Sequence, residues 1–189
     1  MRYLFLGSIS FILMFLFDVF TYKDKKWLKG LFGLSGVGLL LYSTVMLWVL
    51  SPAFHFVLGM RIFFGFLLCF FSGLLVYSLF LEIPFKKTYG KEEHNADLVT
   101  TGTYALCRHP GVIWLFMVYI CLFLISGKSY LFLAGFVFSV VNGLYIVMQE
   151  IFLFTKMFPS YGEYQKTTPM LLPNKLSFRR MIDTMRKGE

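Results

Sequence analysis

Long apolar stretches alternate with short polar segments along this chain, and they predict its architecture. A membrane-spanning helix needs about 20 mostly apolar residues. That length is met or approached by the runs at 2–20, 31–51, 62–81, 111–127 and from 129 to 149, the last continuing in apolar character to 158. The pattern predicts an all-α, polytopic membrane helix bundle with about five transmembrane helices.

The last two apolar runs are joined only by the short stretch SGKS. A connection this short forces the two helices into an antiparallel hairpin. The polar segments 82–110 and 160–189 are each too small to fold alone, so we expect them to pack on each other and cap the bundle. The final stretch, FRRMIDTMRKGE, fits either an amphipathic surface helix or a frayed tail.

The second apolar run contains the glycine-rich stretch GLFGLSGVG. A phosphate-binding glycine loop follows a strand and opens a soluble helix, whereas these glycines lie inside an apolar run. We therefore expect them to let two membrane helices approach closely.

Composition agrees with a membrane protein: 58% of the residues are hydrophobic and 24 are Phe. The net charge of +8 comes from basic residues in loops and in the tail, so anionic lipid is a simpler partner than nucleic acid. The three cysteines have neither the paired spacing of a zinc site nor that of a disulfide framework. We expect buried free thiols and no metal.

The positions of Lys and Arg predict the orientation. With the N-terminus outside, fifteen of them fall on the inner segments and three remain outside, Arg2, Arg61 and Lys128. Basic residues concentrate on the cytoplasmic side of membrane proteins. The loop 82–110 and the C-terminus are therefore predicted to be cytoplasmic.

Glu150 lies between two apolar stretches, SVVNGLYIVMQ and IFLFTKMF. A carboxylate is costly in lipid, so it should face protein, a cation or a wet cavity. Arg108 is the natural partner, since it is predicted on the same side of the membrane. Gln149 is one residue away and therefore turned by about 100 degrees.

The segment GTYALCRHPG places several chemically useful side chains directly before an apolar helix. Gly102 permits a tight turn, and Tyr104 offers a ring and a hydroxyl. Arg108 can grip a carboxylate with two prongs, and His109 can donate or accept a proton near neutral pH. Pro110 suits the first position of a helix. The segment fits a receptor for a carboxylate or phosphate, and it equally fits a basic interface anchor.

With its neighbours, this segment resembles a known family. The stretch LVTTGTYALCRHPG resembles the signature L-V-[ST]-x-G-x-Y-x-x-x-R-H-P-x-Y of the isoprenylcysteine carboxyl methyltransferase-like family and related phospholipid methyltransferases. There the signature precedes a helical hairpin, a late acidic pair, a Y-x-x-Y element and a proline-rich tail. This chain has Gln149-Glu150, then Tyr161 and Tyr164, then PMLLP, all within about 98–173.

The chain departs from the family pattern at four places. Val112 replaces the tyrosine of the signature, and Gln149 replaces one member of the acidic pair. Tyr145 lies near the position of an arginine that is linked to the substrate carboxylate in prenylcysteine enzymes, which argues against prenylcysteine as the acceptor. Ala96 occupies the place of a histidine before the L-V pair, and His94 is two residues early.

The resemblance implies an integral membrane methyltransferase that uses S-adenosylmethionine (SAM). Its acceptor would be a lipid or a lipophilic small molecule that enters from the bilayer. Glu150 and Arg108 would be catalytic, with Glu150 a candidate base. The cofactor pocket would be formed by Leu98, Val99, Gly102, Tyr104, Arg108, His109, Pro110, Glu150, Tyr161 and Tyr164.

The implied organisation is a three-helix membrane region (1–83), a SAM-binding core (84–175) and a basic tail (176–189). Two other classes remain open. Membrane sterol reductases use NADPH and end in a related R-H-x-N-Y motif, whose Asn-Tyr pair this chain lacks. A non-catalytic relative would keep the fold and bind a lipid or a partner.

Overall fold

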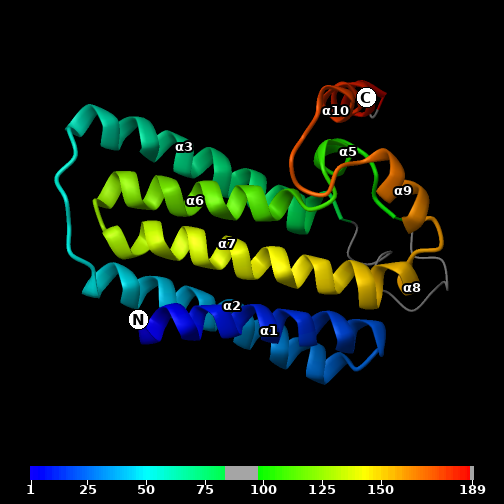
Figure 1. The fold of residues 1–189 in the computed structure, drawn as a ribbon, viewed down its shortest axis with the longest axis horizontal. Coiled ribbons are helices and arrows are strands. Elements are labelled where there is room, and N and C mark those ends of the chain that lie inside the picture. The colour runs from blue at the N-terminus through cyan, green and yellow to red at the C-terminus, as the bar shows by residue number, and fades with distance from the viewer. Residues whose placement is uncertain (84–97, 188–189) are drawn as a thin grey trace.

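The computed structural model describes residues 1–83 and 98–187 as a bundle of long helices that is capped at one end by short helices (Figure 1). Four of the described helices are long and apolar enough to cross a membrane, and a fifth apolar helix is shorter. These five are α1 (Arg2–Tyr22), α2 (Lys26–Leu50), α3 (Leu58–Val76) with the π-helical turn η1 (Tyr77–Leu81), α6 (Pro110–Ser126) and α7 (Ser129–Gln149). The predicted all-α polytopic bundle is confirmed.

α7 continues without a break through the π-helical turn η2 (Glu150–Phe154) into α8 (Thr155–Met157). The cap consists of α5 (Gly102–Leu106), α9 (Tyr161–Thr167) and α10 (Lys175–Lys187). Figure 1 shows the N-terminus at the opposite end of the bundle from this cap.

The second helix differs from the prediction at its start, because it begins at Lys26 rather than at residue 31. Its first turn carries lysines, whose long stems let a helix extend beyond the apolar layer while the charges stay in water. The turn from α1 into α2 is short and is made at Asp24, which has a positive φ of 51°.

The predicted hairpin between α6 and α7 is confirmed. α6 ends at Ser126 and is followed by Gly127, which adopts a left-handed conformation with φ 70°; α7 starts at Ser129. The Gly127 carbonyl accepts a hydrogen bond from the Phe54 amide at 2.9 Å. The linker between α2 and α3 therefore lies against the tip of the hairpin.

The main core lies where α1, α2, α6 and α7 meet. Its fully or almost fully buried residues include Phe11, Leu47, Tyr119, Leu131 and Phe138. α3 packs against α6 but has no fully buried residue, so it lies at the periphery, with Phe63, Phe66 and Phe70 exposed. Cys69 of α3 is exposed and corrects the expectation of buried thiols, whereas Cys107 and Cys121 are buried.

The glycines of α2 fulfil the expected role at two of four positions. A Cβ atom on Gly33 would lie 2.9 Å from the Phe17 ring, and one on Gly36 would lie 3.2 Å from the backbone oxygen of Ser10. Gly30 and Gly38 have nothing within 4 Å. Close approach of α1 and α2 therefore depends on the middle of the glycine-rich stretch.

The described parts of the two polar segments contact each other, as predicted. The backbone amides of Arg108 and His109 donate to the carbonyls of Pro169 and Met170 at 2.9 and 3.2 Å. The tail then forms α10, which corrects the frayed alternative. Asn174 and Ser177 cap it reciprocally, since the Ser177 amide donates to Asn174 Oδ1 and the Asn174 amide donates to Ser177 Oγ.

We predict that Gly36→Leu destabilises the protein by about 1–3 kcal/mol, because overpacking a close contact forces the backbones apart. Gly38→Leu is the matched control on the same helix, where the side chain enters open space. Unfolding of both variants by denaturing detergent, followed by circular dichroism, measures the difference. Equal stability of the two variants would contradict the close packing of α1 on α2.

Candidate active site

The centre of the capped end is the carboxylate of Glu150, the first residue of η2. Arg108 forms a bidentate ion pair with it, in which Nε donates to Oε1 at 2.8 Å and Nη2 donates to Oε2 at 3.1 Å. His109 Nε2 lies 2.8 Å from Oε1, the Tyr161 hydroxyl donates to Oε1 at 2.9 Å, and Gln165 Nε2 donates to Oε2 at 3.0 Å. The predicted pairing of Arg108 with Glu150 is confirmed.

The ion pair is buried, with the Arg108 side chain 10% and the Glu150 side chain 9% exposed. Arg108 Nη1 also donates to the carbonyls of Gln165 and Thr168 at 3.1 and 3.0 Å. Both charges are therefore surrounded by partners, which offsets the cost of removing them from water. The guanidinium donors of Arg108, which were predicted to bind a ligand carboxylate or phosphate, are bonded here to Glu150.

Local structure explains why these groups meet. Pro110 occupies the first turn of α6, and His109 is the residue that caps this helix. The backbone of Arg108 and His109 is held against residues 169–170 by the two hydrogen bonds already described. Arg108 is thereby fixed at the mouth of α6, beside the end of the neighbouring α7.

An aromatic cluster encloses one side of the ion pair. Phe158, Tyr161 and Tyr164 are buried, and Leu98 and Phe154 pack against them. The His109 ring stacks on Phe154, with centroids 6.0 Å apart and planes 11° from parallel. Burial raises the pKa of Tyr161, and the nearby Glu150 carboxylate raises it further, so this phenol remains a hydrogen-bond donor at neutral pH.

α5 connects the aromatic cluster to the end of α3. The Tyr164 hydroxyl donates to the Tyr104 carbonyl at 2.6 Å, and the Tyr104 hydroxyl donates to the Ser78 carbonyl at 3.0 Å. Gly102 has a φ of 55°, which L side chains rarely adopt and which provides the predicted tight turn. Burial raises the pKa of the Tyr164 phenol and raises that of the Cys107 thiol to about 11.

Glu82, which the sequence analysis did not single out, holds the start of α5. Thr103 donates to its carboxylate from the backbone amide, at 2.7 Å, and from the hydroxyl. Burial raises the pKa of Glu82, and the hydrogen bonds from Thr103 oppose that rise. Its signal in the sequence was a carboxylate directly after an apolar run, at the same membrane end as Arg108.

The predicted site residues form a continuous set at this end. Arg108, His109, Glu150 and Tyr161 share hydrogen bonds, and Tyr104 is bonded to Tyr164. Leu98 packs on the aromatic cluster, and Val99 follows it in the same half-buried segment. Ala96 and His94 lie outside the described residues.

A second polar cluster, also missed from the sequence, lies on the other face of α7. The carboxylate of Asp18 in α1 accepts hydrogen bonds from Tyr145 at 2.6 Å and from Gln149 at 2.8 Å. Asp18 is only 6% exposed. Gln149 and Glu150 thus point in different directions, as the helical geometry predicted. An ionisable residue late in the first apolar run was the available signal.

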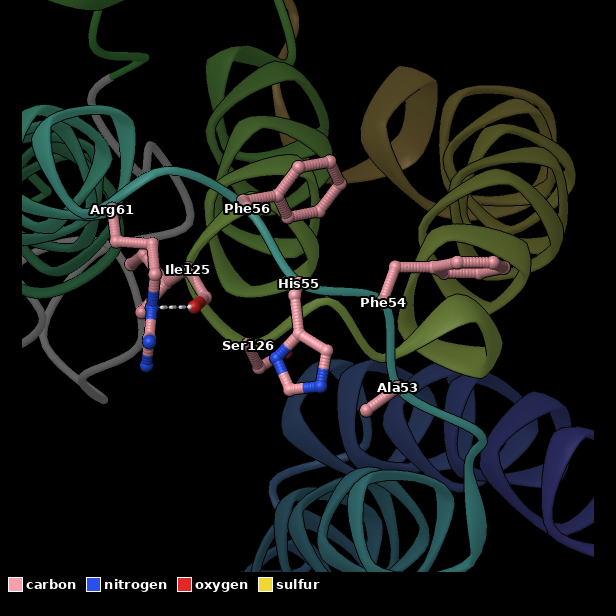
Figure 2. A pocket seen from close by; sticks show the side chains of 7 residues that line it. All are labelled: Ala53, Phe54, His55, Phe56, Arg61, Ile125 and Ser126. Carbon is pink, nitrogen blue, oxygen red and sulfur yellow. Dashed lines mark hydrogen bonds between the residues drawn. The ribbon is translucent and has the colours of Figure 1, made fainter.

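The opposite end of the bundle holds a small hollow of about 150 Å³ (Figure 2). It is lined by the linker 53–56, Arg61 and the end of α6. Arg61 Nε donates to the Ile125 carbonyl at 2.8 Å, which ties the first turns of α3 to the end of α6. The hollow lies far from the ion pair, so we do not assign it to the candidate site.

The fold and the site define a class, a polytopic helical membrane protein with a buried ion pair where its membrane helices meet a polar cap. The family model of phospholipid methyltransferase matches residues 60–160, which is more than half of the chain. The chain therefore belongs to the phospholipid methyltransferase family, and it is a membrane methyltransferase. No curated protein and no solved structure shows significant similarity to it.

We predict that Arg108→Ala destabilises the protein by about 3–5 kcal/mol, because it leaves the buried Glu150 carboxylate without its charged partner. Arg108→Lys should recover only part of this loss, since lysine restores the charge without the planar fork. Detergent-induced unfolding measures both.

Lys166→Ala is the control, because Lys166 forms an exposed pair with Glu163 at 2.7 Å and such pairs contribute at most about 1 kcal/mol. An Arg108→Ala variant as stable as this control would show that the buried pair does not hold the cap.

Proposed function

We propose that the protein transfers a methyl group from SAM to a lipid or a lipophilic small molecule held in the bilayer. The observation that carries this proposal is the buried Arg108–Glu150 pair with its aromatic enclosure, at the capped end of the bundle. The chain that carries it belongs to the phospholipid methyltransferase family. We also propose that this end is cytoplasmic, since fifteen of eighteen Lys and Arg residues then lie on the inner side.

The charges of the site fit a cationic cofactor. Two carboxylates, Glu82 and Glu150, lie at the capped end of the bundle. Among the described residues that bond to these carboxylates, Arg108 is the permanent cation. Counted as ionised, these two carboxylates exceed the Arg108 guanidinium by one negative charge. The rings of Tyr104, Tyr161 and Tyr164 lie in the same region, and aromatic rings attract cations. When bound, SAM supplies a methyl group that is activated by the positive charge on its sulfur.

We propose that the cofactor pocket comprises the residues that the family resemblance indicated. These are Leu98, Val99, Gly102, Tyr104, Arg108, His109, Pro110, Glu150, Tyr161 and Tyr164. In this proposal Glu150 positions its neighbours rather than acting as a base, since both of its oxygens already accept hydrogen bonds from Arg108. Its task is to hold the Arg108 fork, the His109 ring and the Tyr161 hydroxyl in place.

The contribution of the chain is to orient the reactants and exclude water. Methyl transfer needs an in-line approach at roughly 3–3.5 Å in a dry environment. Phe158, Tyr161 and Tyr164 are each less than a tenth exposed, which keeps water from this side. Ile151 and Phe152, directly after Glu150, are more than half exposed and apolar. They support entry of a lipophilic acceptor from the bilayer.

We predict that the purified protein in detergent binds SAM and its demethylated product in calorimetric titrations, and that Glu150→Gln weakens binding at least tenfold. The substitution keeps the shape of the side chain but removes the charge that holds Arg108 and His109, and a charge-assisted hydrogen bond contributes about 1.5–3 kcal/mol. Glu163→Gln is the matched control, because it makes the same change at an exposed position of α9.

Titration with NADPH in parallel separates the other classes. Binding of NADPH in place of SAM would contradict the proposal in favour of a reductase. A folded protein that binds neither SAM, its product nor NADPH would contradict it in favour of a non-catalytic relative.

A further inference from the structure

The C-terminal helix α10 has three distinct stripes along its surface. One stripe faces the protein: Ser177 is 1% exposed, and Thr184 is bonded to the backbone of α5. The second stripe is apolar and consists of Phe178, Ile182 and Met185, at the spacing i, i+4, i+7 of one helix face. Phe178 and Met185 are 53% and 48% exposed.

The third stripe is basic and borders the apolar one. Lys175, Arg179 and Arg186 are exposed and share one face, while Asp183 is the acidic residue of the helix. A helix with an exposed apolar stripe beside a basic stripe is typical of helices that lie in the plane of a membrane surface.

The placement of α10 in the fold agrees with such a position. Figure 1 shows α10 nearly end-on, whereas the long helices run across the view, so its axis crosses the direction of the bundle. It lies at the capped end, where the membrane helices stop. An axis that crosses the membrane helices, at the level of their ends, is the orientation of an interfacial helix.

We propose that α10 is a docking surface for anionic lipid. The apolar stripe inserts at the boundary between head groups and acyl chains, and the basic stripe contacts the lipid phosphates. Charge complementarity selects this occupant, because three exposed cations line the apolar stripe and each attracts an anionic membrane surface. The proposal does not depend on the reaction that the site performs.

The docking surface is bonded to both sides of the candidate site. The Gly102 amide donates to Thr184 Oγ1 at 3.1 Å, which ties α10 to the turn that starts α5. Arg180 Nη1 donates to the Thr167 carbonyl at the end of α9. Lipid bound to α10 therefore fixes α5, which precedes Arg108, and α9, which begins at Tyr161.

Site-directed spin labelling of the full chain in vesicles tests this proposal. In a Cys69→Ser background, which removes the exposed thiol, Phe178→Cys carries the label on the apolar stripe. Leu176→Cys is the matched control, since Leu176 is an equally apolar residue, 66% exposed, on the other side of the same helix. Vesicles contain phosphatidylcholine alone or mixed with phosphatidylglycerol, and oxygen and a water-soluble nickel complex serve as relaxing agents.

In the anionic vesicles, we expect the spin label at 178 to be relaxed by oxygen rather than by the nickel complex. We expect the label at 176 to be relaxed by the nickel complex. Replacing Arg179 and Arg186 together by Gln should lower the ratio of docked to undocked α10 roughly thirtyfold. Three outcomes would overturn the proposal: nickel access at both positions, protection from both agents as a protein partner would give, or equal lipid exposure of position 178 in the two kinds of vesicle.

Discussion

The arrangement of the capped end depends on one interaction, the buried ion pair between Arg108 and Glu150. Removing two charges from water is costly unless every donor and acceptor finds a partner. Here Arg108 donates from all three of its nitrogens, and Glu150 accepts from four side chains. These groups come from the loop before α6, from η2 at the end of α7, and from α9 with the residue that follows it. Because a partly formed set would leave a buried charge unpaired, the three segments must adopt this geometry together.

The end of α7 is held from two directions by consecutive residues. Glu150 bonds to the cap, whereas Gln149 bonds to the buried Asp18 near the end of α1. Residues that are adjacent in a helix point about 100 degrees apart, so one turn of backbone can serve both networks. The first helix thus does more than anchor the protein in the membrane. It fixes the position of the helix that carries the carboxylate of the candidate site.

The sequence predicted the features that follow from strong physical constraints. Apolar length indicated the membrane helices, the brevity of SGKS required the hairpin, and the cost of a charge beside lipid paired Glu150 with Arg108. Contacts between distant segments could not be predicted in this way. Asp18 and Gln149 are 131 residues apart, and periodicity does not say which helix faces meet. The contact between Glu82 and Thr103 could not be predicted for the same reason. The start of α2 was missed because lysines looked like a loop, and the roles of the predicted cofactor residues remain predictions.

The central claim is that the cofactor binds beside the Arg108–Glu150 pair, and photolabelling tests it most directly. The protein would be irradiated with radiolabelled SAM, digested, and mapped by mass spectrometry. The account predicts label in peptides from 98–110 or 150–164, and loss of that label in the presence of excess demethylated product. Label confined to other peptides, or label that the product does not displace, would contradict it.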